Sequence, residues 1–187
     1  MINLPLTLTF IRLLVAPLFV VTFYFVDSGS HILSTVLFVI ASFTDWLDGY
    51  TARSYNLVTR LGEFLDPVAD KVLVVTVLII LLNEYHTLYL SLPALILIIR
   101  EISVSSLREW LASSDSKILI PSSLSAKYKT ACQMLALSFL IFNASVQEGT
   151  VWILGLTLLY ISAGLSLFSF IYYIKTAKPA LTFGVKR

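Results

Sequence analysis

Six long apolar segments take up most of the 187 residues of this chain and leave little sequence for anything else. A helix needs roughly 20 mostly apolar residues to cross about 30 Å of hydrocarbon. The segments are continuous runs without an alternating pattern, which favours helices over a transmembrane β-barrel. We therefore predict an all-α, polytopic membrane protein with transmembrane helices at about 8–26, 32–50, 68–82, 89–107, 130–142 (extended back towards residue 125) and 151–174.

Charged residues are scarce. They make up 13% of the sequence, against 58% hydrophobic residues, whereas an average soluble domain is about 25% charged. This excludes a soluble or disordered protein, and a net charge of +2 provides no basic surface for nucleic acid. Seven glycines and one cysteine exclude collagen-like and disulfide-based folds. The remaining class is an integral membrane protein, which we predict to be one domain over residues 1–187.

Lys and Arg residues are absent from every second connection between the apolar segments. The connections 27–31, 83–88 and 143–150 contain no Lys or Arg, and all thirteen basic residues lie at or near the opposite ends. Because cytoplasmic loops are enriched in Lys and Arg, this pattern predicts six spans with both termini in the cytoplasm. The first residues carry no basic leader, so we expect no cleaved signal peptide.

The second segment carries two aspartates near its cytoplasmic end, in a region where charged groups are costly and often functional. Asp45 and Asp48 are three residues apart, so they differ by about 60° around a helix. Gly49 and Ala52 fall within about 40° of Asp45 on the same face. Two carboxylates and two very small residues therefore form one stripe, which a bulky ligand or another backbone could approach closely.

The third segment begins with a matching stripe. Gly62, Asp66 and Asp70 are spaced at i, i+4 and i+8 and share one face, provided that the helix includes Gly62. The two segments are antiparallel neighbours, so we expect their stripes to face each other at the cytoplasmic end. One such Asp alone would indicate a helix cap or a solvated charge, but four facing carboxylates repel each other strongly. Their all-oxygen set suits Mg²⁺ or Mn²⁺, and paired metals recur in displacement at phosphorus.

The two stripes and the connection between them form one pattern, Asp45-x2-Asp48-Gly49-x2-Ala52-Arg53-x8-Gly62-x3-Asp66-x3-Asp70. This pattern resembles the whole signature of the CDP-alcohol phosphatidyltransferase family, with all eight fixed positions present. The six-span layout is also the one that the family has. The resemblance implies an enzyme in which a hydroxyl compound displaces CMP from a CDP-linked lipid or alcohol, and it also implies a homodimer.

The resemblance further implies roles for these residues. The four aspartates would hold a two-metal site with Mg²⁺ or Mn²⁺, and Asp70 would also be the general base that takes the proton from the acceptor hydroxyl. The pocket for the CDP-lipid would be lined by Gly49, Ala52, Arg53, Thr59 and Gly62. The metals would neutralise the diphosphate and stabilise the CMP leaving group, while the attacking oxygen aligns with the β-phosphorus.

The residues around the signature indicate which members of the family the chain resembles most. The stretches TDWLDGYTAR, RLGEFLDPVADKVLV and IIREISVSSLREW are most similar to bacterial members that use CDP-diacylglycerol as donor and sn-glycerol 3-phosphate as acceptor. The products would be phosphatidylglycerol phosphate and CMP. Such an enzyme would lie in the bacterial inner membrane among its lipids, with the active site facing the cytoplasm.

Four basic residues at the cytoplasmic side of the fourth and fifth segments agree with an anionic acceptor: Arg100, Arg108, Lys127 and Lys129. Arg binds phosphate in a bidentate manner, and Lys binds it as a point charge. The alternative is that they anchor the protein to anionic lipid headgroups. Arg100 lies in an apolar run and therefore needs a partner, which is either the substrate or Glu101. Arg108 could bind the phosphate or form an ion pair with Glu101 or Glu109.

Three alternative functions stay open at this point. A member of the same family with another acceptor, such as a cardiolipin or phosphatidylserine synthase, would use the same metal chemistry. A cation transporter could use the aspartates as its ion site, although transporter sites usually lie near the membrane midplane. A non-catalytic scaffold, in which Gly and Ala mediate helix packing, predicts that Asp-to-Asn changes matter little.

Overall fold

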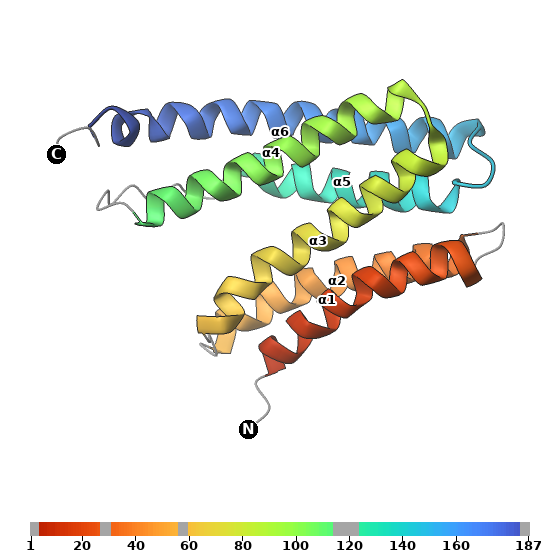
Figure 1. The fold of residues 1–187 in the computed structure, drawn as a ribbon, viewed down its shortest axis with the longest axis horizontal. Helices are drawn as coiled ribbons and strands as arrows, with labels where there is room; N and C mark the ends of the chain where they lie inside the picture. Colours follow the sequence, from red (N-terminus) through yellow and green to blue (C-terminus); the bar gives the residue numbers. More distant parts are fainter. Residues whose placement is uncertain (1–3, 27–30, 56–59, 114–123, 184–187) are drawn as a thin grey trace.

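The computed structural model describes residues 4–26, 31–55, 60–113 and 124–183. Within these ranges the chain is helical apart from short connections, and no strand is formed (Figure 1). The elements are α1 (Leu4–Val21), a π-helical turn η1 (Thr22–Val26), α2 (Ile32–Tyr55), α3 (Arg60–Tyr85), α4 (Leu88–Ser113), α5 (Leu124–Phe142) and α6 (Gly149–Phe183). The prediction of an all-α fold is therefore confirmed.

Each predicted apolar segment coincides with a helix, but several helices continue beyond the apolar run. α2 continues to Tyr55, and α3 already begins at Arg60. This extension is possible because polar side chains near a helix end can reach water while the backbone keeps its i to i−4 hydrogen bonds. The signature residues before and after the α2–α3 connection consequently lie on helices.

Among the described residues, two helical stretches are long and apolar enough to cross a membrane, Leu88–Leu107 in α4 and Gly149–Thr176 in α6. Three shorter apolar stretches occur in the part of the chain that the structure describes: Leu13–Val26, Ile32–Thr44 and Tyr128–Phe142. Core helices of soluble proteins can reach such lengths as well, so two stretches do not establish six spans. The number of spans stays a prediction.

Buried apolar side chains join the helices into a bundle. α6 packs against α4 and α5, α1 packs against α2 and α3, and both α2 and α3 contact α5 (Figure 1). All six α-helices contribute fully buried side chains to the core, among them Phe19, Phe38, Leu78, Leu97, Leu137 and Leu159. The core therefore runs through the whole bundle and holds the helices that carry the candidate site.

Large apolar side chains also cover the outer faces of the bundle. Phe25, Leu88 and Phe168 are 81%, 78% and 69% exposed, and similar residues are exposed on every α-helix. Soluble monomers rarely expose large contiguous apolar patches, whereas lipid tails are as apolar as these side chains. This surface supports a membrane environment for the chain.

The helix ends are sorted to two sides of the bundle. In Figure 1 the start of α1, the end of α2, the start of α3, the end of α4, the start of α5 and the end of α6 all lie towards the left. Consecutive helices therefore run in alternating directions. The end of α2 and the start of α3 lie on the same side of the bundle as the start of α1 and the end of α6.

α5 and α6 come close together where α6 has Gly155. A Cβ atom at this position would lie 2.9 Å from Leu140 Cγ and 3.2 Å from Phe139 Cβ. Leu140 is fully buried, so it cannot swing out into solvent and could make room only within the packed interior. The missing side chain of Gly155 therefore sets the distance between the two helices, as small residues commonly do in helix pairs.

We predict that Gly155→Ala lowers the free energy of unfolding by about 1–3 kcal/mol, the usual cost of inserting a carbon atom into a packed core. Gly164→Ala is the matched control, because it lies in the same helix and its Cβ would meet nothing within 4 Å. This control should be neutral or stabilising by up to about 1 kcal/mol, since Ala favours helix more than Gly does. Thermal unfolding in detergent measures both variants, and equal stabilities would contradict the close contact.

Candidate active site

Both aspartate pairs lie on helical backbone. Asp45 and Asp48 are in the second half of α2, and Asp66 and Asp70 are in the first half of α3. Residues three or four apart share a helical face, so the two predicted stripes have the backbone that they require. Because α3 begins at Arg60, its first turn includes Gly62, and the condition attached to the second stripe is met.

The structure places the helices of this site but not all of its side chains. Thr59 lies outside the described residues. The side-chain surroundings of ten further residues also lie outside the described part: Asp45, Asp48, Gly49, Ala52, Arg53, Gly62, Asp66, Asp70, Arg108 and Lys127. That the two stripes face each other, and that small residues line a nucleotide pocket, therefore stay predictions.

The ligand types on α2 and α3 fit a hard divalent cation. Aspartate oxygens are ligands that Mg²⁺ and Mn²⁺ prefer, and the signature contains no softer His or Cys ligand. Among the described side chains, which do not include these four aspartates, no group of three or more His, Cys, Asp or Glu gathers. The chemistry of the four aspartates is thus the observation that supports a metal site.

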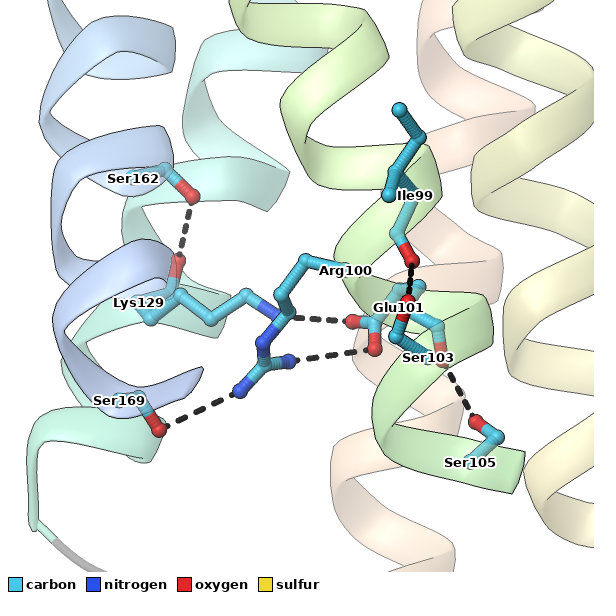
Figure 2. Close-up of polar contacts among 8 residues, drawn as sticks. All are labelled: Ile99, Arg100, Glu101, Ser103, Ser105, Lys129, Ser162 and Ser169. Carbon is cyan, nitrogen blue, oxygen red and sulfur yellow. Dashed lines mark hydrogen bonds and ion pairs between the residues drawn. The ribbon is translucent and has the colours of Figure 1, made fainter. Parts of the chain in front are cut away.

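A buried ionic cluster joins α4 and α5 (Figure 2). Oε1 of Glu101 lies 2.7 Å from Nζ of Lys129, and Oε2 lies 3.2 Å from Nη1 of Arg100. The side chains of Arg100 and Lys129 are only 7% and 4% exposed, and that of Glu101 is 23% exposed. Charges buried to this degree are costly unless they are paired and hydrogen-bonded, and here one carboxylate serves two cations.

Two serines of α6 complete the surroundings of this cluster. The Ser169 hydroxyl accepts a hydrogen bond of 3.3 Å from Nη2 of Arg100 (Figure 2). The Ser162 hydroxyl donates a hydrogen bond of 3.2 Å to the backbone oxygen of Lys129. Both serines are buried. The guanidinium of Arg100 is therefore held by Glu101 of its own helix and by Ser169 of α6.

α3 also contributes charge near this cluster. Lys71, the residue after Asp70, interacts electrostatically with Glu101. α3 packs against both α4 and α5. α3 therefore packs on both helices that form the cluster, and its Lys71 adds positive charge to the surroundings of Glu101.

The structure brings together two of the four predicted basic residues, Arg100 and Lys129. Of the two partners considered for Arg100, the structure shows Glu101. The pairing of Lys129 with Glu101 was not predicted, because the two residues are 28 positions apart on different helices and no spacing rule connects them. The sequence feature that could have indicated this pairing is Glu101 itself, because a carboxylate within an apolar helix needs a cationic partner, which a neighbouring helix can supply.

Comparison with known proteins adds evidence along the whole chain. Residues 2–168 match the family model described as CDP-alcohol phosphatidyltransferase. The protein named CDP-diacylglycerol--glycerol-3-phosphate 3-phosphatidyltransferase in Haemophilus influenzae is 44% identical over 179 residues, which cover 96% of this chain and 95% of that protein.

Two further relatives carry the same name. The protein of Wigglesworthia glossinidia brevipalpis is 41% identical over 176 residues, covering 94% of this chain and 95% of its own length. That of Salmonella paratyphi A is 39% identical over 181 residues, covering 96% of this chain and 97% of its own length. With the signature on α2 and α3 and a match over nearly its full length, this chain belongs to the CDP-alcohol phosphatidyltransferase family.

Proposed function

We propose that this chain transfers a phosphatidyl group from CDP-diacylglycerol to sn-glycerol 3-phosphate and releases phosphatidylglycerol phosphate and CMP. The observation that carries the proposal is 44% identity, over 96% of the chain, to a protein whose name states this donor and this acceptor. All eight signature residues are also present, so the positions that bear the chemistry are intact.

The reaction is a displacement at the β-phosphorus of the donor. The hydroxyl oxygen of glycerol 3-phosphate forms a new bond to this phosphorus, and the bond from the phosphorus to the oxygen of CMP breaks. CMP leaves with that oxygen. The proton of the attacking hydroxyl passes to the carboxylate of Asp70, which we assign as the general base. Much of the rate enhancement in such a reaction comes from holding the reacting groups in line.

The negative charge of the donor diphosphate requires a positive counterpart. We assign two divalent cations, Mg²⁺ or Mn²⁺, to the carboxylates of Asp45, Asp48, Asp66 and Asp70. When bound, these ions supply positive charge that neutralises the diphosphate and the leaving CMP. The assignment is supported by the oxygen ligands and by the place of all four aspartates in the second half of α2 and the first half of α3. The end of α2 and the start of α3 lie on the same side of the bundle (Figure 1).

The remaining signature residues suit a pocket for the CDP group. Gly49, Ala52 and Gly62 lie on the same helices as the aspartates, and their small size leaves room for a nucleotide close to the backbone. Arg53, at the end of α2, and Thr59, in the connection that follows, supply polar groups for the same ligand.

We assign the acceptor phosphate to the basic residues of α4 and α5, namely Arg100, Arg108, Lys127 and Lys129. The ionic cluster supports this assignment, because it already gathers two of them in one place. The interaction of Lys71 with Glu101 supports a location near Asp70. This proximity is required because glycerol 3-phosphate carries its phosphate and its attacking hydroxyl within one small molecule.

The proposed arrangement in the membrane has six spans, both termini in the cytoplasm and the active site on the cytoplasmic side. The placement of all thirteen basic residues supports it. The start of α1 and the end of α6 also lie on the side of the bundle where α2 ends and α3 begins (Figure 1). The bacterial origin of the relatives supports the bacterial inner membrane as its location. We also propose a homodimer, as the family resemblance implies.

The proposed reaction predicts that purified protein in detergent releases CMP from CDP-diacylglycerol only when glycerol 3-phosphate and Mg²⁺ or Mn²⁺ are both present. Chelation with EDTA should abolish release, and added Mg²⁺ should restore it. Release with serine or phosphatidylglycerol but not with glycerol 3-phosphate would keep the reaction type and contradict the acceptor. Folded protein that releases no CMP with any acceptor would contradict enzymatic activity and favour the transporter or scaffold.

Asp70→Asn should reduce turnover by about 10²–10⁴-fold, the contribution typical of a general base. The amide keeps the size of the side chain but cannot take the proton, so most of the donor affinity should remain. CMP release measures turnover, and equilibrium binding of CDP-diacylglycerol measures affinity. Glu148→Gln is the control, because Glu148 is exposed and belongs to the connection between α5 and α6, which lies on the opposite side of the bundle from the start of α3 (Figure 1). Normal turnover in Asp70→Asn would exclude this residue as the base.

Gly49→Leu should block binding of CDP-diacylglycerol, because a large side chain would fill the space that the nucleotide occupies. Gly164→Leu is the matched control, since Gly164 also lies in a helix but has open space at its Cβ position. Donor binding by both folded variants is the measurement. Unchanged affinity in Gly49→Leu would mean that the stripe on α2 does not face the donor.

A further inference from the structure

We infer that Glu101 is a positioning residue, which holds Lys129 and Arg100 together so that both can bind the phosphate of the acceptor. This inference rests on the proposed function, and it assigns a role to an acidic residue in a site that otherwise consists of cations. Glu101 itself would repel a phosphate, so its effect on binding has to act through the two basic side chains.

The two oxygens of the Glu101 carboxylate have separate partners. Oε1 lies 2.7 Å from the Lys129 ammonium, and Oε2 lies 3.2 Å from Nη1 of Arg100. Arg100 and Glu101 are neighbours on α4, whereas Lys129 comes from α5. Figure 2 shows the Lys129 ammonium and the Arg100 guanidinium both directed at this one carboxylate. One side chain thereby joins basic groups from two helices.

Removing the negative charge would leave two cations close together in a poorly solvated place. Arg100 and Lys129 are among the most buried polar residues described in the bundle, and like charges repel strongly at low dielectric. Without the carboxylate the long, flexible side chains would separate, and the site would lose the arrangement that fits a phosphate. The carboxylate thus offsets the repulsion before the acceptor arrives.

The contacts of Arg100 leave it able to bind a further group. Its Nη1 is used by Glu101 and its Nη2 by Ser169, but its buried Nε has no hydrogen-bond partner in the described part of the chain. On α6 the buried Ser166 hydroxyl, one turn from Ser169, also has none within that part. Both groups can donate a hydrogen bond, and a phosphate oxygen can accept from either.

The test compares steady-state kinetics of the wild type, Glu101→Gln, Glu101→Asp and the exposed control Glu148→Gln. We expect Glu101→Gln to raise KM for glycerol 3-phosphate by about tenfold, which corresponds to the loss of one hydrogen bond to a charged group. KM for CDP-diacylglycerol should not change, because the donor site is on α2 and α3. Glu101→Asp keeps the charge and should restore part of the acceptor affinity, and Glu148→Gln should match the wild type.

Three results would overturn the inference. An unchanged KM for glycerol 3-phosphate in Glu101→Gln would mean that the carboxylate does not position the cations. A lowered KM would mean that it competes with the acceptor for them. Parallel losses for both substrates together with a lower melting temperature would assign Glu101 to folding alone. A wild-type protein that does not use glycerol 3-phosphate at all would instead contradict the proposed function and the inference with it.

A double-mutant cycle with Lys129→Met tests whether Glu101 acts through Lys129. If it does, adding Glu101→Gln to Lys129→Met should raise KM for glycerol 3-phosphate by less than Glu101→Gln does in the wild type, since coupled residues are not additive. Fully multiplicative effects of the two changes would show that they act independently and would contradict the inference.

Discussion

The pairing of charge inside an apolar bundle is the constraint on which the candidate site depends. The interior of α4, α5 and α6 cannot solvate an isolated cation or carboxylate, so every charge that is placed there needs a partner. The cluster of Arg100, Glu101 and Lys129 meets this requirement with one carboxylate between two cations. Because the cluster and its serines come from three helices, the position of these helices and the pairing of the charges depend on each other.

Close packing of α5 on α6 supports that pairing. The helices run antiparallel, and Gly155 allows α6 to approach α5 at Leu140. Ser162 lies about two turns further along α6 than Gly155. Its hydroxyl donates a hydrogen bond to the backbone oxygen of Lys129 on α5. A change in the distance between the helices would therefore also move the ammonium away from Glu101. Stability and site geometry are linked at this interface.

The sequence predicts the helices well, because long apolar runs are the pattern expected of helices in hydrocarbon. In such surroundings a helix satisfies the hydrogen bonds of its own backbone. It predicts helix ends less well. α2 continues to Tyr55 and α3 begins at Arg60, since polar residues there remain helical although they end the apolar run. The spacing of the aspartates could be interpreted from sequence because it lies within helices, where position determines the face.

The ionic cluster shows what sequence spacing cannot reveal. Arg100 and Glu101 are adjacent in an apolar run, so a partner for each could be expected, but the identity of a partner on another helix depends on how the helices pack. Lys129 is predicted to be a phosphate ligand, and the structure shows that it contacts Glu101. The approach of α5 to α4 arises because both pack on α6, and no local pattern in the sequence describes that packing.

α3 connects the two parts of the proposed site. Asp70 and Lys71 are successive residues, so they occupy neighbouring faces of the helix about 100° apart. Lys71 adds to the positive charge around Glu101, while Asp70 belongs to the predicted stripe that it shares with Asp66. In the proposed reaction the acceptor must place its phosphate on the cluster and its hydroxyl at Asp70. In this proposal a single helix, α3, would border both regions.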